Sequence, residues 1–317
     1  MPTLEERVSA LEAQTPRRSY TSMWSGEEID RRLLNAAGRN LLDNSWWVRK
    51  EAIVNQRGLL AYNTNGYCID RWILWDANTT LEITENGLQI YRNSHTGGAP
   101  FVHKFEQNSL APGVYTLSAL STNGVVNLNY YIEGVGDIFV DLDTDKELAT
   151  HTFTIPETVK DKNHWASIAG KYGSILRAAK LELGSVQTLA HKDAAGNWVL
   201  NDPPPDYGLE LLKCQRYQVI VDGEANGIMG RIESTGSNIS LFMPTPVQMR
   251  ANPTVKIKQL KITGDGGLAT TWDINTSGIA MPTGIQVHMN LSSSAGLAPY
   301  QSIFCDAVQG YSLDSNL

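Results

Sequence analysis

The sequence has little cysteine and no strongly basic segment. Its 317 residues include only Cys68, Cys214 and Cys305, too few and too widely spaced for a disulfide framework, and no Cys-x-x-Cys pair offers a zinc site. The formal net charge of −7 argues against nucleic acid as the principal partner. No apolar run approaches the roughly 18 to 20 residues that span a bilayer, and the N-terminus has no signal-peptide core. We therefore expect neither nucleic-acid binding nor membrane insertion.

Motifs of common catalytic sites are absent as well. The sequence contains no Gly-x-Ser-x-Gly elbow, no phosphate-binding loop, no His-Glu-x-x-His and no regular Rossmann fingerprint. The run Asp141-Leu-Asp-Thr-Asp145 resembles the start of a calcium loop, but Lys146 and Thr152 stand where that loop requires glycine and glutamate. We interpret the run as a solvated acidic turn. A carboxylate pair for sugar hydrolysis is defined by its separation in space, so the sequence indicates no particular pair.

The N-terminal region predicts two short helices. An a/d spacing of apolar residues predicts a short coiled-coil helix over residues 1–16, with a frayed amphipathic tail as the alternative. Two heptads cannot hold a coiled coil alone, so an oligomer would need support elsewhere. Residues 17–40 are predicted to be a connector with a second short helix, which Ser25 and Glu28 begin as a capping box and Gly38 ends.

From residue 41 onward the pattern is that of strands. Asn-Gly pairs, a strong signal for tight hairpin turns, stand between β-rich runs at 65–66, 86–87, 123–124 and 226–227. Nine strands are predicted in the first part, at residues 67–76, 81–85, 88–92, 114–121, 125–133, 137–140, 150–155, 164–169 and 174–183. Their spacing suits an antiparallel sandwich over residues 41–186.

A proline-rich linker is predicted to separate this sandwich from a second one. Residues 187–207 contain a predicted small hairpin around 193–197 and then three consecutive prolines, which cannot lie inside a sheet. Seven further strands are predicted over 208–317, at residues 213–221, 228–233, 238–243, 254–262, 269–275, 284–290 and 300–307. The expected fold class is all-β, with two antiparallel, jelly-roll-like β-sandwich domains in series after a short N-terminal α-helical or coiled-coil segment.

Aromatic residues and acidic charge concentrate before the second sandwich. Seven of the eight tryptophans lie outside 208–317, and the rings of Trp and Tyr can stack on the apolar face of a pyranose. Core packing is the alternative for each ring. Trp72 and Leu74 share one face of their strand, and Ile73 and Trp75 share the other. Because both faces are apolar, strand alternation does not tell which Trp packs in the core and which is free to contact a ligand. Residues 41–207 carry 13 positive and 19 negative side chains, which favours a neutral or cationic glycan over a polyanionic one.

Several segments resemble proteins of one family. They are similar to segments of the tail-fibre, or receptor-binding, proteins of tailed bacteriophages and prophages, which carry a jelly roll like a carbohydrate-binding module. The segments of the first sandwich are Asn40-Leu-Leu-Asp-Asn-Ser-Trp-Trp47, Val54-Asn-Gln-Arg-Gly58, Gly66-Tyr-Cys-Ile-Asp-Arg-Trp72, Leu110-Ala-Pro-Gly-Val-Tyr-Thr-Leu-Ser118 and Ala179-Lys-Leu-Glu-Leu-Gly184. The others are Trp24-Ser-Gly-Glu-Glu-Ile-Asp-Arg31, Leu211-Leu-Lys-Cys-Gln-Arg-Tyr217 and Pro246-Val-Gln-Met-Arg-Ala-Asn-Pro-Thr254.

The resemblance implies a role in attachment to host cells. It implies a homotrimer in a virion tail, assembled in the host cytoplasm, that is fixed to another tail or baseplate protein near residue 1 and presents its β domains to bacterial surface glycan. The C-terminal domain would serve in receptor binding or trimerisation, although residues 305–317 run past the usual last strand. We expect no cofactor. A structural calcium ion is possible because jelly rolls of this kind often hold one, but the sequence shows no complete set of calcium ligands.

We expect a carbohydrate-binding adhesin that is not an enzyme. The glycan-facing candidates are aromatic or hydrogen-bonding residues outside the quoted segments, namely Trp75, Tyr91, Arg92, Tyr131 and Trp165. No catalytic residue is assigned. Two alternatives remain open at this point, a polysaccharide depolymerase and a purely structural trimeric spacer of the tail.

Overall fold

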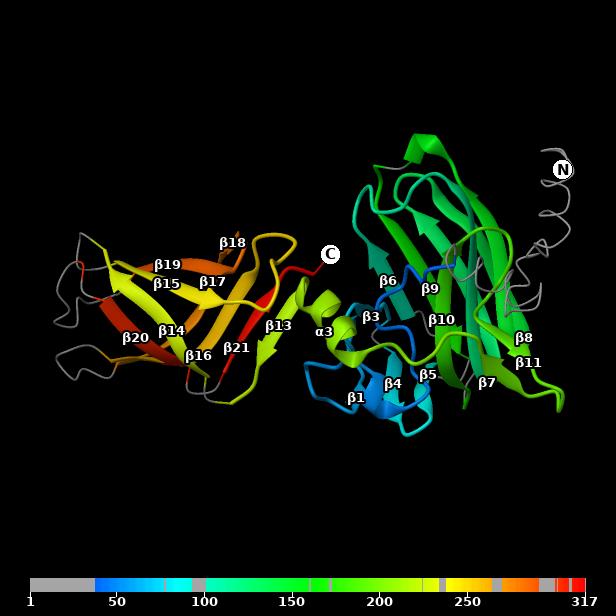
Figure 1. Cartoon of the computed structure of the whole chain (residues 1–317), viewed down its shortest axis with the longest axis horizontal. Helices are drawn as coiled ribbons and strands as arrows, with labels where there is room; N and C mark the ends of the chain where they lie inside the picture. Colours follow the sequence, from blue (N-terminus) through cyan, green and yellow to red (C-terminus); the bar gives the residue numbers. More distant parts are fainter. Residues whose placement is uncertain are drawn as a thin grey trace, which may run out of the picture.

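The described part of the chain forms two β bodies in series, joined by the α-helix α3 (Tyr207–Gln215) (Figure 1). The computed structural model describes residues 38–76, 78–92, 101–159, 161–170, 173–223, 225–233, 238–263, 270–290, 300, 302–307 and 310–316. Antiparallel strands dominate both bodies, which confirms the all-β prediction. The two helices predicted before residue 38 lie outside the described residues.

The first body is built on a ten-stranded sheet. Its strands are β1 (Ala61–Tyr62), β2 (Gly66–Tyr67), β3 (Trp72–Leu74), β4 (Thr79–Thr84), β5 (Gly87–Arg92), β6 (Phe101–Phe105), β7 (Gly113–Ile132), β8 (Gly136–Ile155), β9 (His164–Gly170) and β10 (Ile175–Leu183). They follow the order β1-β4-β5-β10-β7-β9-β6-β3-β2, with β8 paired to β7. Two short 3-10 helices, η1 (Lys50–Ala52) and η2 (Glu157–Val159), precede β1 and β9.

The long strands β7 and β8 turn this sheet into a sandwich. The first half of β7 pairs with β10 and its second half with β9, while β8 runs beside both halves. The register slips around Asn123 and Gly124, where Gly124 has a φ of 120°. This Asn-Gly pair is therefore a bulge within one strand, and the hairpin turn predicted there is wrong. The bend places Tyr130 against Phe153, with ring centroids 4.3 Å apart, so that the two halves of the hairpin cover one core.

The acidic run 141–145 also differs from its prediction. It lies inside β8, and the turn between β7 and β8 falls at residues 133–135. Among the described strands β8 pairs only with β7, so it is an edge strand, and charged residues on an edge strand discourage pairing with other chains. Asp141 Oδ2 lies 2.7 Å from His151 Nδ1, so the carboxylate of Asp141 forms a hydrogen bond with another side chain of β8.

The segments that resemble tail-fibre proteins build the core of the first body. Trp47 and Trp72 are fully buried, and Trp72 stacks on Phe101 with ring centroids 4.4 Å apart. Asn44 holds two loops together, because its Nδ2 donates to the carbonyls of Val54 and Asp70 at 2.8 and 2.9 Å. Trp47, Trp72 and Asn44 are therefore structural, and none of them is among the described residues that line a pocket.

The linker contains a hairpin and ends in a helix. Strands β11 (Ala190–Lys192) and β12 (Trp198–Leu200) pair as predicted around residues 193–197. A strand was predicted at 213–221, but α3 extends to Gln215 and the strand β13 spans only Gln218–Val221. Asp206 caps the helix, since its Oδ1 accepts a hydrogen bond from the Leu209 N–H at 2.9 Å. The carboxylate of Glu210 accepts the Asn44 N–H at 2.9 Å and anchors the helix on the first body.

The second body is a nine-stranded sheet around an aliphatic core. Besides β13 it contains β14 (Ala225–Ile232), β15 (Asn238–Pro244), β16 (Thr254–Thr263), β17 (Thr270–Ser277), β18 (Ile279–Met281), β19 (Gly284–Asn290), β20 (Ser302–Ala307) and β21 (Tyr311–Asp314). The order is β13-β21-β16-β20-β14-β15-β19-β18, with β17 paired to β16. The chain end therefore returns as β21 between β13 and β16, next to the first body (Figure 1).

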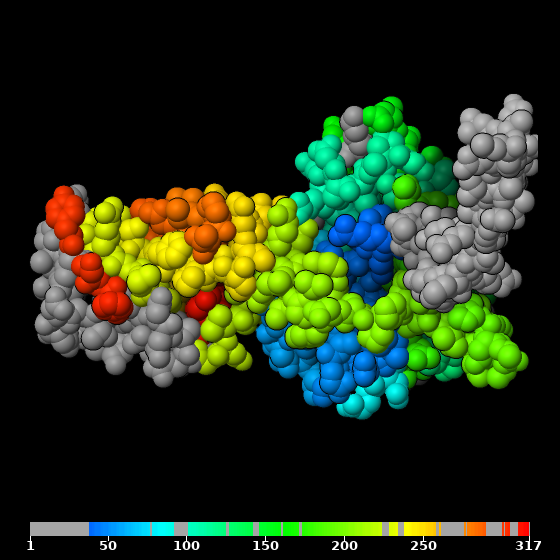
Figure 2. Space-filling model, in the orientation of Figure 1, coloured from blue at the N-terminus to red at the C-terminus, as the bar shows by residue number. Residues whose placement is uncertain are grey.

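Polar contacts join the two bodies. The guanidinium of Arg71 lies 3.5 Å from the ring centroid of Tyr217, whose hydroxyl donates to Glu106 Oε1 at 2.5 Å. Arg216 reaches the same carboxylate at 3.3 Å. Burial alone would raise the pKa of Glu106, but the hydrogen bonds from Tyr217 and Arg216 outweigh it and hold the pKa below its ordinary value. Figure 2 shows the two bodies in direct contact at this junction.

Candidate functional site

A pocket lies on the outward face of the first body, across strands β6, β9, β7 and β8. Along β9 the core takes His164, Ala166 and Ile168, which leaves Trp165 and Ser167 on the opposite face. Backbone pairing then sets Trp165 beside Tyr131 of β7, and Ser167 beside Val102 and Asn129. Strand alternation and register thus bring these side chains together from three separate segments of the sequence.

Three aromatic rings form one end of the pocket. Trp75, which follows β3, is 49% exposed and meets Trp165 edge to face, with ring centroids 6.3 Å apart. Tyr131 lies against Trp165 at 4.8 Å. The ammonium of Lys104 lies 5.2 Å from the Trp75 centroid and 5.9 Å from that of Trp165. Burial lowers the pKa of Lys104, and the nearby charge of Glu133 opposes that shift.

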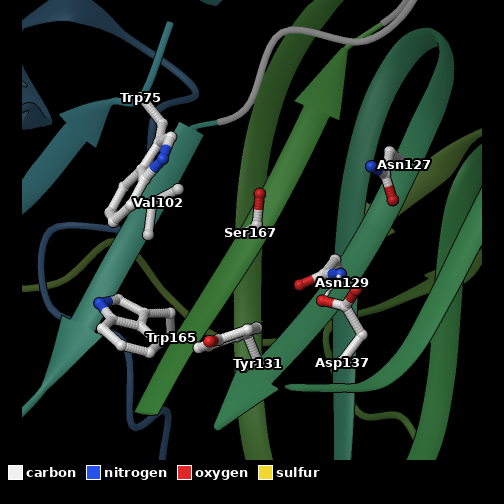
Figure 3. Close-up of a pocket in the computed structure, with 8 residues that line it drawn as sticks. All are labelled: Trp75, Val102, Asn127, Asn129, Tyr131, Asp137, Trp165 and Ser167. Atoms are coloured by element: carbon white, nitrogen blue, oxygen red, sulfur yellow. Dashed lines mark hydrogen bonds between the residues drawn. The ribbon is translucent and has the colours of Figure 1, made fainter. Parts of the chain in front are cut away.

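Amide and carboxylate groups form the other end. Asn129 Nδ2 donates to Asp137 Oδ1 at 2.7 Å, and its carbonyl oxygen points toward the hollow (Figure 3). The buried Oδ1 of Asn127, two residues earlier on the same face, has no hydrogen-bond partner among the described residues. The buried Nε1 of Trp165 is likewise without a partner in that part of the chain. The pocket therefore offers acceptors at its polar end, from the amide oxygen of Asn129 and the carboxylate of Asp137.

The size and lining of the pocket suit a polar ligand with apolar faces. Its volume is about 450 Å³, within the range of small-molecule sites, and it is open along the sheet. Ring faces can stack on the C–H face of a sugar, while amides and a carboxylate hydrogen-bond its hydroxyl groups. The described lining residues are Trp75, Val102, Asn127, Asn129, Tyr131, Asp137, Trp165 and Ser167 (Figure 3).

Three of the five residues predicted from the sequence meet in this pocket, Tyr91 lies outside its described lining, and the side chain of Arg92 is not among those that the structure describes. Trp75, Tyr131 and Trp165 form its aromatic end. Tyr91 lies on β5, where its hydroxyl donates to Glu82 Oε1 on β4 at 2.9 Å. Arg92 is the last residue of β5, and its backbone is paired with Thr79. Within the described chain, strand β5 pairs with β4 and β10 and with none of the strands that carry the pocket.

The polar half of the pocket was not predicted from the sequence. The alternation of Asn127, Asn129 and Tyr131 along one strand indicates that these three share a face, and this signal was available. The contributions of Val102 and Ser167 depend on strand pairing, and β6 was not among the predicted strands. Asp137 joins the site only because β8 folds back on β7 at residues 133–135.

Other polar clusters of the described chain are structural. Lys180 is fully buried, and its ammonium lies 2.6 Å from Asp202 and 3.8 Å from Glu182, which also accepts from Thr188. In the described ranges no three His, Cys, Asp or Glu side chains gather in a way that could hold a metal ion. Within the same ranges, no helix is both long and apolar enough to cross a membrane.

Comparison with known proteins gives one structural likeness to report. No protein-family model matches the chain, and no curated protein matches it. The fold is similar to the N-terminal CBM22-1-CBM22-2 tandem of Xyn10C from Paenibacillus barcinonensis, with 9% sequence identity and a TM-score of 0.27, over 88% of this chain and 97% of that one. A TM-score of this size carries no argument about function. The fold and the pocket themselves define a two-body, all-β protein with an aromatic and polar surface site.

Proposed function

We propose that the chain is a carbohydrate-binding receptor-recognition protein, and that it serves a bacteriophage tail fibre in attachment to the bacterial surface. The observation that carries carbohydrate binding is the pocket, in which three aromatic rings stand beside the amides of Asn127 and Asn129 and the carboxylate of Asp137. This combination of stacking surfaces and hydrogen-bonding groups matches the two faces of a sugar ring. The tail-fibre role rests on the similar sequence segments of both bodies.

Binding without cleavage is part of the proposal. Sugar hydrolysis needs two carboxyl groups about 5 to 9.5 Å apart, and Asp137 is the sole carboxylate among the described lining residues. A depolymerase is the competing function, and a structural spacer is the third. Release of reducing ends from purified host capsule would favour the depolymerase. Failure of the pocket variants below to change adsorption would favour the spacer.

Association of several copies is also proposed, with a homotrimer as the expected state. A row of apolar side chains supports it on the second body, in which two of the three are exposed and one is half-buried. Phe304, Met229 and Phe242 occupy paired positions on β20, β14 and β15, and we call these three residues the apolar row. On the same face Arg231 and Glu233 follow Met229 at alternate positions, so a second copy could meet both an apolar and an oppositely charged surface. Several copies would raise the avidity of weak single sites.

The decisive experiment measures adsorption to host cells and binding to a bacterial glycan array. We expect Trp165→Ala to weaken monovalent glycan binding about tenfold, because a lost stacking ring and its buried area amount to about 1.5 kcal/mol. Trp198→Ala is the matched control, since Trp198 also carries a lysine over its ring, Lys192 at 5.2 Å, but lies on the linker hairpin. Equal effects of both variants, or no binding of any bacterial glycan by the intact protein, would overturn carbohydrate binding at this pocket.

A further inference from the structure

The charges around the pocket are divided between its two ends. Lys104, Trp165, Tyr131 and Asp137 occupy directly paired positions on β6, β9, β7 and β8. Lys104 and Asp137 are therefore three strand spacings apart, or about 14 Å along the sheet. The ammonium of Lys104 lies 5.2 Å from the ring centroid of Trp75. Trp75 and Asp137 lie on opposite sides of the pocket (Figure 3).

The distance decides which charge acts on a ligand at the polar end. The Debye length at physiological ionic strength is about 8 Å, so the positive charge of Lys104 is largely screened there. Glu133, which acts on Lys104, offsets that charge further. Asp137 remains as the near charge, and its Oδ1 is held by Asn129 at 2.7 Å. The polar end is thus locally negative.

The uncharged groups at the polar end point to the same ligand chemistry. The Oδ1 of Asn127 is buried without a described partner, and the carbonyl of Asn129 points into the hollow. The amide oxygen of Asn129 and the carboxylate of Asp137 present acceptors, which call for hydrogen-bond donors on the ligand. The neighbouring faces of Tyr131 and Trp165 carry the negative π density that attracts a cation.

We infer that the polar end of this pocket takes the ammonium group of an amino sugar. The inference rests on the proposed carbohydrate binding and specifies its ligand as a glycan with a free, unacetylated amine. One sugar ring stacks at the aromatic end, and the ammonium donates to Asp137 and to the amide oxygen of Asn129. N-acetylation of the sugar removes the charge and two of the three donors, so it should be selected against.

Binding of paired oligosaccharides tests this inference directly. The probes are a β-1,4-linked glucosamine hexamer and its fully N-acetylated counterpart, titrated by calorimetry into the intact protein at near-physiological salt. We expect the free amine form to bind roughly five to ten times more tightly, as for a charged hydrogen bond at a partly exposed carboxylate. Asp137→Asn, which keeps the shape and the acceptor for Asn129, should abolish this preference. Glu147→Gln, an exposed carboxylate on β8 away from the pocket, should leave it unchanged.

The outcomes separate this inference from the proposed function. Equal affinity for the two hexamers, tighter binding of the acetylated form, or a preference that survives Asp137→Asn would overturn the amino-sugar assignment. Binding of other glycans in a manner that Trp165→Ala abolishes, with no binding of either hexamer, would also overturn it but leave carbohydrate binding in place. A melting temperature of Asp137→Asn equal to that of the parent protein shows that the loss of preference is not a loss of folding.

Discussion

The two bodies of this protein use their outward sheet faces in different ways. On the first body the rings of Trp75, Tyr131 and Trp165 stand beside amides and a carboxylate around a hollow. On the second body the apolar row crosses three strands, with Phe304 66% and Met229 54% exposed. A hollow lined by rings and amides suits a small polar ligand, whereas exposed Phe and Met side chains around an open, mostly apolar hollow of about 350 Å³ suit another protein surface. This contrast is the reason why we propose glycan recognition for the first body and association of copies for the second.

The two cores differ as well. Rings from Trp47, Trp72, Phe101, Tyr130 and Phe153 fill the first core, whereas the buried cluster described for the second consists of Val, Ile, Leu and Met side chains. Aromatic residues are bulky and interlock edge to face, so one truncation leaves a large void. We therefore expect the first body to be the more sensitive one to single core substitutions.

The largest expected effect comes from Trp72→Ala. Trp72 is fully buried, stacks on Phe101 and donates from Nε1 to the carbonyls of Asp43 and Asn44, both at 3.0 Å. Its truncation should lower the free energy of unfolding of the first body by about 3 to 5 kcal/mol. Trp75→Ala, three residues on and half exposed, should cost less than about 1 kcal/mol. Chemical denaturation followed by tryptophan fluorescence checks both, and similar losses would contradict the assignment of core and surface.

The junction between the bodies should depend on pH through Glu106. Its pKa is lowered in the folded protein, so the contact is fully present above the ordinary pKa of a glutamate and is lost as the pH falls through the lowered value. In calorimetry we expect the unfolding of the two bodies to be coupled at neutral pH and to separate in acid. Glu106→Gln should separate them at all pH values, with about 1 to 2 kcal/mol of coupling lost. Coupling that persists in this variant would show that other contacts hold the junction.

Local patterns predicted the class of fold well but failed where tertiary pairing overrides them. The sequence correctly grouped Trp72 with Leu74 and Ile73 with Trp75, yet both faces are apolar, and only the folded sheet shows that Trp75 is exposed. Asn123 and Gly124 carry a strong turn signal, but β8 and β9 pair along the strand on either side and turn it into a bulge. Asp206 could have predicted the start of α3, because aspartate is a preferred N-cap residue, but the three prolines before it favoured the interpretation of this segment as a linker.

The candidate site could be predicted only in part for the same reason. Trp75, Tyr131 and Trp165 were selected as aromatic residues outside the similar segments, a criterion that also admitted Tyr91. Whether a residue is aromatic and lies outside the similar segments can be read from the sequence alone. Whether it lines a pocket depends on which residues of neighbouring strands are paired with it. Ser167 and Asn129 meet because β9 pairs with β7 at that position, and no property of either residue alone predicts it.

The smallest expected effect on stability tests most directly whether the apolar row of the second body serves association and not packing. Ile303 and Phe304 are neighbours on β20, but Ile303 is 1% exposed and Phe304 66%. Ile303→Ala should lower the free energy of unfolding by about 2 to 5 kcal/mol, whereas Phe304→Ser should change it by less than about 0.5 kcal/mol. Because Phe304 belongs to the apolar row, its substitution should instead shift analytical ultracentrifugation profiles toward smaller species. A variant that loses stability without any change in association would mean that the row is part of the packing of a single chain.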